Sequence, residues 1–202
     1  MAQPQTSRIA ILASGSGSNA EKIISYFQDH PSIEVALVLS NSQEAHVLDR
    51  AARLGIPSRV FTKTEFRETT AVVDWLKSDD VTHLVLAGFL WLIPPHMIRA
   101  FPDRIINIHP SLLPRHGGKG MYGMKVHEAV KEAGDALAGI TIHLINERYD
   151  EGRILFQTSC PVDLSDSPSH IAEKVHQLEY TSYPRVIEQW ITGQPIRSSL
   201  TK

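Results

Sequence analysis

A chain of 202 residues, 42% of them hydrophobic and 21% charged, has the composition of an ordinary globular protein and can form one domain with a sizeable core. Its formal net charge of −2 argues against a protein that binds nucleic acid or an anionic membrane surface through bulk charge. The lone cysteine, Cys160, excludes an intramolecular disulfide and suits a reducing cytosol. The N-terminus lacks the pattern of a signal peptide, and the most apolar segment, 84–93, is shorter than the ~20 residues that span a bilayer. We therefore expect a cytoplasmic protein with no membrane partner.

The first predicted elements are a strand over residues 8–13 and a helix that begins just after Gly17. Ser18, with Glu21 three residues later, has the form of a capping box for that helix. The turn between them is rich in glycine, which lets the backbone approach a ligand closely. Because the N–H groups and the dipole of a helix N-terminus favour negative charge, the turn predicts a phosphate site.

The same turn also matches the loose dinucleotide-binding fingerprint Gly15-x-Gly17-x-x-Ala20. Nicotinamide binding would need an acidic residue at the end of the second strand, 33–39, to hold a ribose. The uncharged segment 40–43 follows that strand instead. A ligand of monophosphate size is therefore the better match.

Strands and helices alternate through the middle of the chain, which predicts an α/β protein with a mostly parallel sheet. The expected elements are a helix over 45–54 closed by Gly55, a strand over 58–61, a helix capped by Thr64 and running to 78, a strand over 83–87 and a short helix to 100. The apolar segment 89–93 is unusual for a loop. It is either a core loop or an apolar wall for a flat aromatic ligand.

The segment 107–114 joins an amide and an imidazole at the end of a strand. Pro110 cannot donate a ladder hydrogen bond, so the strand ends near Asn107 and His109, whose side chains point to the same side. Ligand sites in open α/β sheets lie at such strand ends. For an isolated Asn-x-His the alternative, that both side chains only satisfy a proline-rich turn, is more common.

The remaining elements close the chain. The glycine-rich connection 115–124 indicates either a flap that closes over substrate or a surface loop. A helix over 125–133, strands over 138–144 and 154–161, and a long helix from 168 to 190, bent at Pro184, should follow. The ten histidines are scattered, and none has the spacing of a helical zinc site, so we expect no catalytic metal.

With these pieces in place, the sequence closely resembles the phosphoribosylglycinamide formyltransferases, folate-dependent enzymes of purine biosynthesis, nearly from end to end. The resemblance implies one formyltransferase domain over residues 1–202, with a Rossmann-like open, mostly parallel sheet, helices on both faces and an antiparallel strand near the C-terminal end. It rests on Gly15-Ser16-Gly17-Ser18-Asn19, Leu86-Ala87-Gly88-Phe89, the whole of 107–114, Gly139-Ile140-Thr141-Ile142-His143 and Tyr149-Asp150-Glu151-Gly152.

The resemblance also implies the reaction, in which the amine of glycinamide ribonucleotide takes the formyl group of the co-substrate 10-formyltetrahydrofolate. Asn107, protonated His109 and Asp150 would be the catalytic set. The first two would stabilise an oxyanion, and Asp150 would raise the pKa of His109 and help a bound water take the amine proton. The implied binding residues are Gly17, Ser18, Asn19 and Glu179 for the ribonucleotide, and Leu90, Trp91, Leu92, Ile93 and Asn107 for the folate.

Some features depart from the family pattern or leave other functions open. Trp91 stands where many relatives have arginine, and Arg67 is out of register with the family's folate-contacting arginine, which aligns with Thr69. A methionyl-tRNA formyltransferase would need a tRNA-binding domain and a basic surface. A formyltetrahydrofolate hydrolase would normally have a regulatory domain before the first strand. A phosphate sensor would not need Asn107, His109 and Asp150 together. We expect a monomer or a homodimer.

Overall fold

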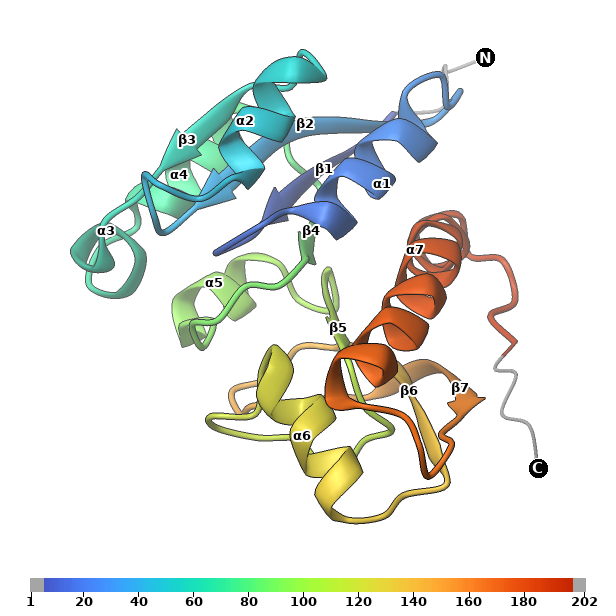
Figure 1. The fold of residues 1–202 in the computed structure, drawn as a ribbon. Helices are drawn as coiled ribbons and strands as arrows, with labels where there is room; N and C mark the ends of the chain where they lie inside the picture. Colours follow the sequence, from blue (N-terminus) through green and yellow to red (C-terminus); the bar gives the residue numbers. More distant parts are fainter. Residues whose placement is uncertain (1–5, 198–202) are drawn as a thin grey trace. The chain divides into compact units, whose positions relative to one another are not determined.

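The computed structural model describes residues 6–197 and divides the chain into two compact units, Met1–Ile106 and Asn107–Lys202 (Figure 1). Strand β5, Ile105–His109, begins in the first unit and ends in the second. The strands form a seven-stranded sheet in the order β3-β2-β1-β4-β5-β6-β7. The open α/β sheet predicted from the sequence is confirmed.

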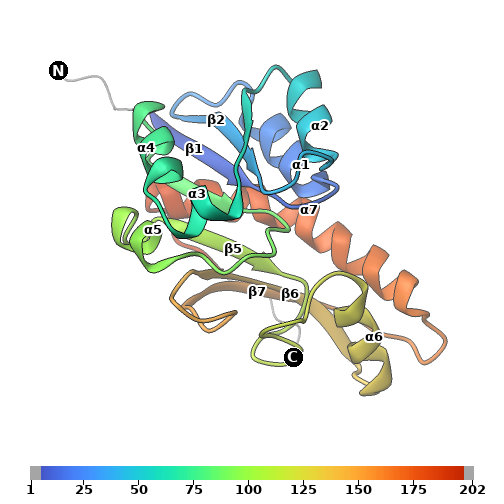
Figure 2. The ribbon, with the colours of Figure 1, turned by 90° about the vertical axis from the view of Figure 1, so that its left-hand side faces the viewer.

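The first unit is built on four parallel strands, of which three are largely buried and the short edge strand over 58–60 is mostly exposed. Parallel strands with both faces covered contain continuous apolar runs, and Ile9 to Leu12 are completely inaccessible. Helices α1 and α2 lie on one face of these strands and α4 on the other (Figure 2). The strands are β1 (Ser7–Leu12), β2 (Ile33–Ser40), β3 (Ser58–Val60) and β4 (His83–Leu86). The helices are α1 (Ser18–Phe27), α2 (Val47–Arg53), α3 (Lys63–Arg67), α4 (Ala71–Ser78) and α5 (Pro95–Ala100).

Helix α1 begins where the sequence predicts, but the predicted capping box is wrong. Gly17 is the N-cap residue, at φ 74°, and no side chain caps the helix. The Glu21 carboxylate turns away to accept hydrogen bonds from Arg50 and from Arg53 (2.9 Å). Two guanidinium groups from α2 outcompete a backbone N–H for this carboxylate, because charge-assisted hydrogen bonds are the stronger ones.

The single helix predicted over 64–78 is wrong as well, since the structure has two helices there. Thr62 caps α3 in a true capping box: its hydroxyl accepts from Glu65 N–H (3.2 Å), and the Glu65 carboxylate accepts from Thr62 N–H (2.7 Å). Thr69 then separates the helices. Its hydroxyl donates to the Glu65 carbonyl (3.0 Å) and accepts from Ala71 N–H (3.2 Å), so one side chain serves the end of α3 and the start of α4.

The second unit contains the end of β5, an antiparallel pair and two helices. The pair is β6 (Leu137–Leu144) and β7 (Ile154–Pro161), which confirms the antiparallel strand expected near the C-terminal end. The helices α6 (Met124–Glu132) and α7 (Pro168–Thr192) pack against each other, and α7 also packs against β6 and β7 (Figure 1).

Helix α7 forms over the predicted region, but it ends two residues later than predicted, and two of its apolar residues are not on the buried face. Ser167 caps it by accepting from His170 N–H (3.2 Å), and the helix continues past Pro184 to Thr192. Leu178 and Trp190, although apolar, are only half-buried. Glu179 and Tyr183, one turn apart, are buried. Between residues 6 and 197 no helix is both long and apolar enough to cross a membrane.

The buried His127 on α6 predicts a loss of stability in mild acid. Its side chain is 2% exposed, and burial, followed by the nearby His176 and His109, lowers the pKa of His127 to about 4. Between pH ~6.5 and 4 the unfolded chain binds a proton at this position and the folded chain does not. Above pH ~6.5 His127 therefore causes no loss in the free energy of unfolding. As the pH drops to 4, the free energy of unfolding falls by roughly 3 kcal/mol because of this residue.

Urea unfolding at pH 7.5 and at pH 4.5 measures this effect. His127→Gln, whose side chain stays neutral, should lose less stability between the two pH values than the unmodified protein. The control is His46→Gln at the start of α2, whose side chain is 81% exposed and pairs only with exposed Asp49. Equal pH dependence in both variants would contradict the assignment to His127.

Candidate active site

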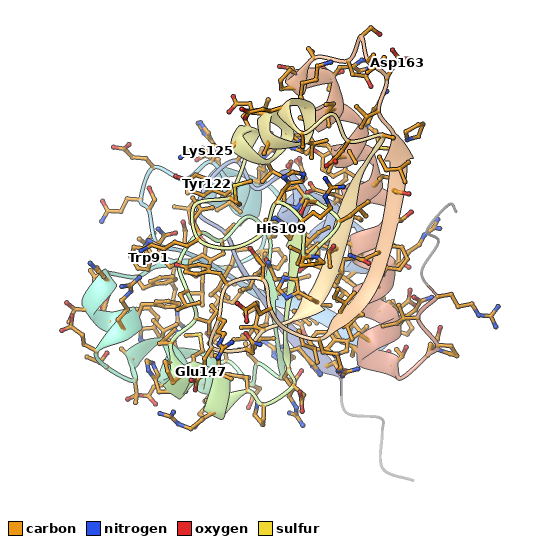
Figure 3. All side chains as sticks on the ribbon, turned by 90° about the horizontal axis from the view of Figure 1, so that it is seen from below. Trp91, His109, Tyr122, Lys125, Glu147 and Asp163 are labelled. Carbon is orange, nitrogen blue, oxygen red and sulfur yellow. The ribbon has the colours of Figure 1, made fainter. Side chains whose placement is uncertain are left out.

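Four polar side chains of the second unit converge at the end of β5. Asn107 and His109 lie on β5, His143 on β6, and Asp150 in the loop that joins β6 to β7. His109 Nδ1 is 3.6 Å from Asp150 Oδ2, and His143 Nε2 is 3.7 Å from Asp150 Oδ1. The structure thus brings together the three residues that the sequence nominated for catalysis. We call Asn107, His109, His143 and Asp150 the β5 cluster, and Figure 3 labels His109 within it.

Backbone carbonyls determine which ring nitrogens in the β5 cluster have hydrogens. A carbonyl oxygen can only accept, so His109 Nε2–H donates to the His116 carbonyl (2.9 Å) and His143 Nδ1–H to the Leu144 carbonyl (3.0 Å). In neutral His143 the remaining nitrogen, Nε2, accepts from Asn107 Nδ2 at 3.2 Å. The orientation of the Asn107 carboxamide is therefore fixed by His143.

The His109 imidazole is almost completely buried, and this determines its charge. Burial is the largest influence and lowers its pKa, while the Asp150 carboxylate and the His116 carbonyl act in the opposite direction without outweighing it. Since the ordinary pKa of histidine, ~6.5, is already below 7, the ring is neutral at neutral pH. Asp150 acts on the pKa of His109 in the expected direction, but burial outweighs it, so the net pKa is lowered and not raised.

Asp150 is held in an unusual backbone conformation with its carboxylate directed at the two rings. Its φ of 57° lies in the left-handed region, which aspartate tolerates better than most residues. Gly118 N–H donates to its Oδ2 at 2.8 Å. Burial alone would raise the pKa of Asp150, but the two histidine rings and this N–H outweigh it and lower the pKa. The carboxylate is therefore ionised and directed toward His109.

Two residues of this region have roles that the sequence did not reveal. His143 belongs to a motif of the resemblance but had no assigned role; the structure shows that it orients Asn107. His116 was only a member of the glycine-rich connection, and its carbonyl binds His109. Because this contact is made by backbone, no residue type in the sequence could signal it.

The glycine-rich turn in the first unit has the geometry expected of an anion site. Gly17 lies at φ 74°, and a Cβ placed on it would be 2.6 Å from Cβ of Val47, so α2 packs directly on this glycine. The first intrahelical bond of α1 runs from Glu21 N–H to the Gly17 carbonyl (2.9 Å). The N–H groups of Ser18 and Asn19 thus precede the helical ladder and can bind an anion.

The apolar segment after β4 divides between core and surface. Phe89 and Ile93 are buried, Leu90 is 46% exposed, and Trp91 and Leu92 are half-buried. Trp91, labelled in Figure 3, closes an aromatic cluster in the first unit. That cluster consists of Phe61, Phe66, Phe89 and Trp91, with ring centroids between 4.9 and 6.4 Å apart. Phe89 and Ile93 thus belong to the core, whereas the apolar wall for a ligand stays a prediction for Leu90, Trp91 and Leu92.

Glu179 on α7 is buried, with 6% of its surface exposed, one turn before Tyr183. It is close enough that its charge, together with the larger effect of burial, raises the pKa of Tyr183 well above the ordinary value. Across residues 6–197, no group of three or more histidine, cysteine, aspartate or glutamate side chains is arranged to hold a metal ion.

Comparison with known proteins identifies the class of enzyme that this fold and cluster form. The family model described as Formyl transferase matches residues 7–187, so the chain belongs to the formyl transferase family. Among its relatives, the chloroplastic phosphoribosylglycinamide formyltransferase of Arabidopsis thaliana is 40% identical over 92% of this chain, and the phosphoribosylglycinamide formyltransferase of Haemophilus influenzae is 36% identical over 94%. The chain spans 65% of the Arabidopsis protein and 89% of the Haemophilus protein.

Solved structures lead to the same family. The glycinamide ribonucleotide transformylase 1 of Symbiobacterium toebii superposes with a TM-score of 0.85 at 32% identity, with 95% of this chain and 90% of that chain covered. The phosphoribosylglycinamide formyltransferase of Brucella melitensis superposes with a TM-score of 0.83 at 33% identity, with 94% of this chain and 98% of that chain covered.

Proposed function

We propose that this protein is a phosphoribosylglycinamide formyltransferase. It transfers the formyl group of 10-formyltetrahydrofolate to the amine of glycinamide ribonucleotide, giving formylglycinamide ribonucleotide and tetrahydrofolate, in de novo purine biosynthesis. The observation that carries the proposal is that Asn107 and His109, on a strand, and Asp150, on a distant loop, converge in one partly buried cluster.

In this proposal neutral His109 handles the proton of the reaction. The attacking amine must lose a proton as the new C–N bond forms, and His109 Nδ1 has the lone pair to accept it, since Nε2–H is already bonded to the His116 carbonyl. Asp150, 3.6 Å away, stabilises the imidazolium that results. His109 can then return the proton to the folate nitrogen as its bond to the formyl carbon breaks. The histidine becomes protonated during the reaction rather than before it.

Asn107 is the proposed donor to the oxygen of the formyl group. That oxygen becomes negative when the amine adds to the carbon, and a preorganised N–H donor is worth most at that moment. One Asn107 Nδ2 hydrogen binds His143, so the carboxamide is oriented before the substrate arrives and its second hydrogen remains for the oxygen. The imidazolium of His109 adds a second donor.

The remaining binding roles follow the chemistry of the two reactants. Gly17, Ser18 and Asn19 would bind the phosphate of the ribonucleotide through the N-terminus of α1, and the buried carboxylate of Glu179 would accept hydrogen bonds from ribose hydroxyls. Leu90, Trp91 and Leu92 would line the pterin pocket, because their partly exposed surface suits a flat ring, and the buried Ile93 would support them from below.

Arg67 would hold the anionic tail of the folate. It lies in the last turn of α3, with its guanidinium 5.7 Å from the centroid of the Trp91 ring, so arginine and tryptophan form one wall. We predict that Arg67→Met raises KM for the folate about tenfold and leaves KM for the ribonucleotide unchanged. Steady-state kinetics with each substrate varied in turn measures both constants.

The control is Arg59→Met, because Arg59 stacks on Trp75 at the same 5.7 Å elsewhere in the first unit. That variant should leave both constants as they are. If Arg67→Met and Arg59→Met behave alike, Arg67 is not the folate-binding cation.

We further propose that residues 1–202 function as one formyltransferase domain, as a monomer or homodimer in the cytoplasm, without a catalytic metal. The match of the family model to residues 7–187 supports the single domain. The lone Cys160 suits a reducing compartment.

A formyl-transfer assay with two acceptors tests the proposed function. Purified protein with 10-formyltetrahydrofolate is offered glycinamide ribonucleotide and initiator methionyl-tRNA in parallel, and release of free formate is followed without acceptor. Formylation of the ribonucleotide alone is expected. Preference for the tRNA would indicate a methionyl-tRNA formyltransferase. Release of formate would indicate the hydrolase, and phosphate binding without turnover would indicate a sensor.

A further inference from the structure

The first residues of the glycine-rich connection link the two ends of the His109–Asp150 pair. The His116 carbonyl accepts from His109 Nε2–H at 2.9 Å, and Gly118 N–H donates to Asp150 Oδ2 at 2.8 Å. We call residues 116–118 the flap root. A single short stretch of backbone thus contacts both proposed catalytic side chains: His109 at Nε2, the nitrogen away from Asp150, and Asp150 at Oδ2, the oxygen that faces His109.

The flap root is itself held by an ion-pair cluster that the proposed reaction does not use. His116 Nε2 is 2.7 Å from Asp135 Oδ2, and Arg115 Nη2 is 2.5 Å from Asp135 Oδ1. The Asp135 side chain, which follows α6, is only 8% exposed. A buried carboxylate with two well-placed partners gives a defined geometry.

Side-chain packing alone does not explain the position of His116. A cavity of about 240 Å³ lies along the flap root, and Arg115, His116 and Asp135 all contribute to its lining. His116 also has a φ of 51°, a left-handed conformation that costs a non-glycine residue about 1 kcal/mol. Open space adjoins the residue and its backbone is strained, so hydrogen bonds hold it: its side chain binds Asp135, and its carbonyl accepts from His109 and, at 3.5 Å, from Ser111 Oγ.

We propose that His116 and Asp135 are positioning residues for His109: the Asp135 carboxylate anchors the His116 side chain, and the His116 carbonyl then fixes the rotation of the His109 ring so that Nδ1 faces the reactants and Asp150. This inference rests on the proposed function for its effect on turnover, but its structural part stands independently. Neither residue contacts the reacting atoms in this scheme.

The first test compares two substitutions of His116. His116→Ala removes the anchor, and kcat should fall roughly tenfold while KM for both substrates changes less than about threefold, because the loss is one of orientation. In His116→Gln the side-chain amide places an N–H donor about where His116 Nε2 lies, and glutamine has a similar conformational strain at positive φ. This variant should therefore recover most of kcat. Equal loss in both variants would mean that the anchor to Asp135 is irrelevant.

The second test is a double-mutant cycle with a matched control. Asp135→Ala should lower kcat at least as far as His116→Ala does, because it also releases Arg115, and the double variant should be no worse than Asp135→Ala alone. The control is Asp166→Ala, which removes another buried carboxylate paired with a histidine (His170, 2.7 Å) and a cation (Lys174, 2.5 Å) on the same unit. It should lower Tm and leave kcat unchanged. Additive losses in the double variant would overturn the proposal.

The third test is a readout of His109 that does not depend on turnover. In ¹⁵N-histidine NMR spectra the Nε2–H resonance of His109 should be protected from exchange in the unmodified protein and in Asp166→Ala, and lost in His116→Ala and Asp135→Ala. The spectra are recorded at constant pH, because Asp150, His143, His116 and His127 all act on or near this ring. An unchanged resonance in both variants overturns the proposal, even if the chain proves to transfer no formyl group at all.

Discussion

Asp150→Asn is expected to lower kcat for formyl transfer by about 10²- to 10³-fold, without measurable loss of ribonucleotide affinity. Asparagine has the same shape and tolerates the φ of 57° at this position, so the substitution removes the charge and keeps the backbone. Without the carboxylate 3.6 Å from His109 Nδ1, the imidazolium that forms on proton uptake is no longer stabilised. His109→Ala, which removes the proton acceptor itself, should be at least as severe.

Calorimetric titration with the ribonucleotide and single-turnover assays separate binding from chemistry in these variants. Asp80→Asn is the matched control, because Asp80 also lies at positive φ (53°), in the first unit and outside the β5 cluster. Its turnover should equal that of the unmodified protein. Turnover near the unmodified rate in Asp150→Asn or His109→Ala would remove both residues from the mechanism.

Gly17→Ala is expected to weaken phosphate binding and to destabilise the fold. The new Cβ would be 2.6 Å from Val47 Cβ and 2.7 Å from Val47 Cα, so the turn or α2 must move. Together with the strain of a left-handed conformation, the free energy of unfolding should fall by about 2–4 kcal/mol. Affinity for the ribonucleotide should fall at least about tenfold, and affinity for its dephosphorylated analogue should change little.

Gly55→Ala separates the steric clash from the strain of the left-handed backbone. Gly55 has nearly the same φ, 71°, but a Cβ placed there meets nothing within 4 Å. This variant should show only the conformational cost, about 1 kcal/mol in urea unfolding, and bind the ribonucleotide normally. Equal loss of affinity for the phosphorylated and dephosphorylated ligands in Gly17→Ala would contradict the phosphate site.

Regular elements were predictable where one periodicity dominates. The strand over 154–161 was predicted with its observed bounds, because a short apolar, strand-like run ends there at a proline. Between residues 62 and 71 several threonines compete as caps, so the pattern predicted one helix where Thr62 and Thr69 produce two. Local hydrogen bonds between side chain and backbone decided the outcome, and a periodic pattern does not contain them.

The β5 cluster was predictable in its membership and not in its chemistry. Motif resemblance nominated Asn107, His109 and Asp150, and the structure brings them together. The effect of Asp150 on the His109 pKa could be inferred, whereas the burial that outweighs it could not, so the net direction of the shift was missed. The role of His116 depends on a carbonyl direction that only the three-dimensional backbone provides.

The most direct test of the account is an NMR titration of the His109 ring in ¹³C-histidine-labelled protein, with the resonance assigned by its absence in His109→Ala. The account predicts a pKa for His109 below the ordinary ~6.5, so that the proton-accepting form is retained at neutral pH and is lost only as the pH falls through that lower value. Because Asp150 raises this pKa, Asp150→Asn should lower it further. A His109 pKa above 6.5, or one that Asp150→Asn leaves unchanged, would contradict the proposed proton transfer.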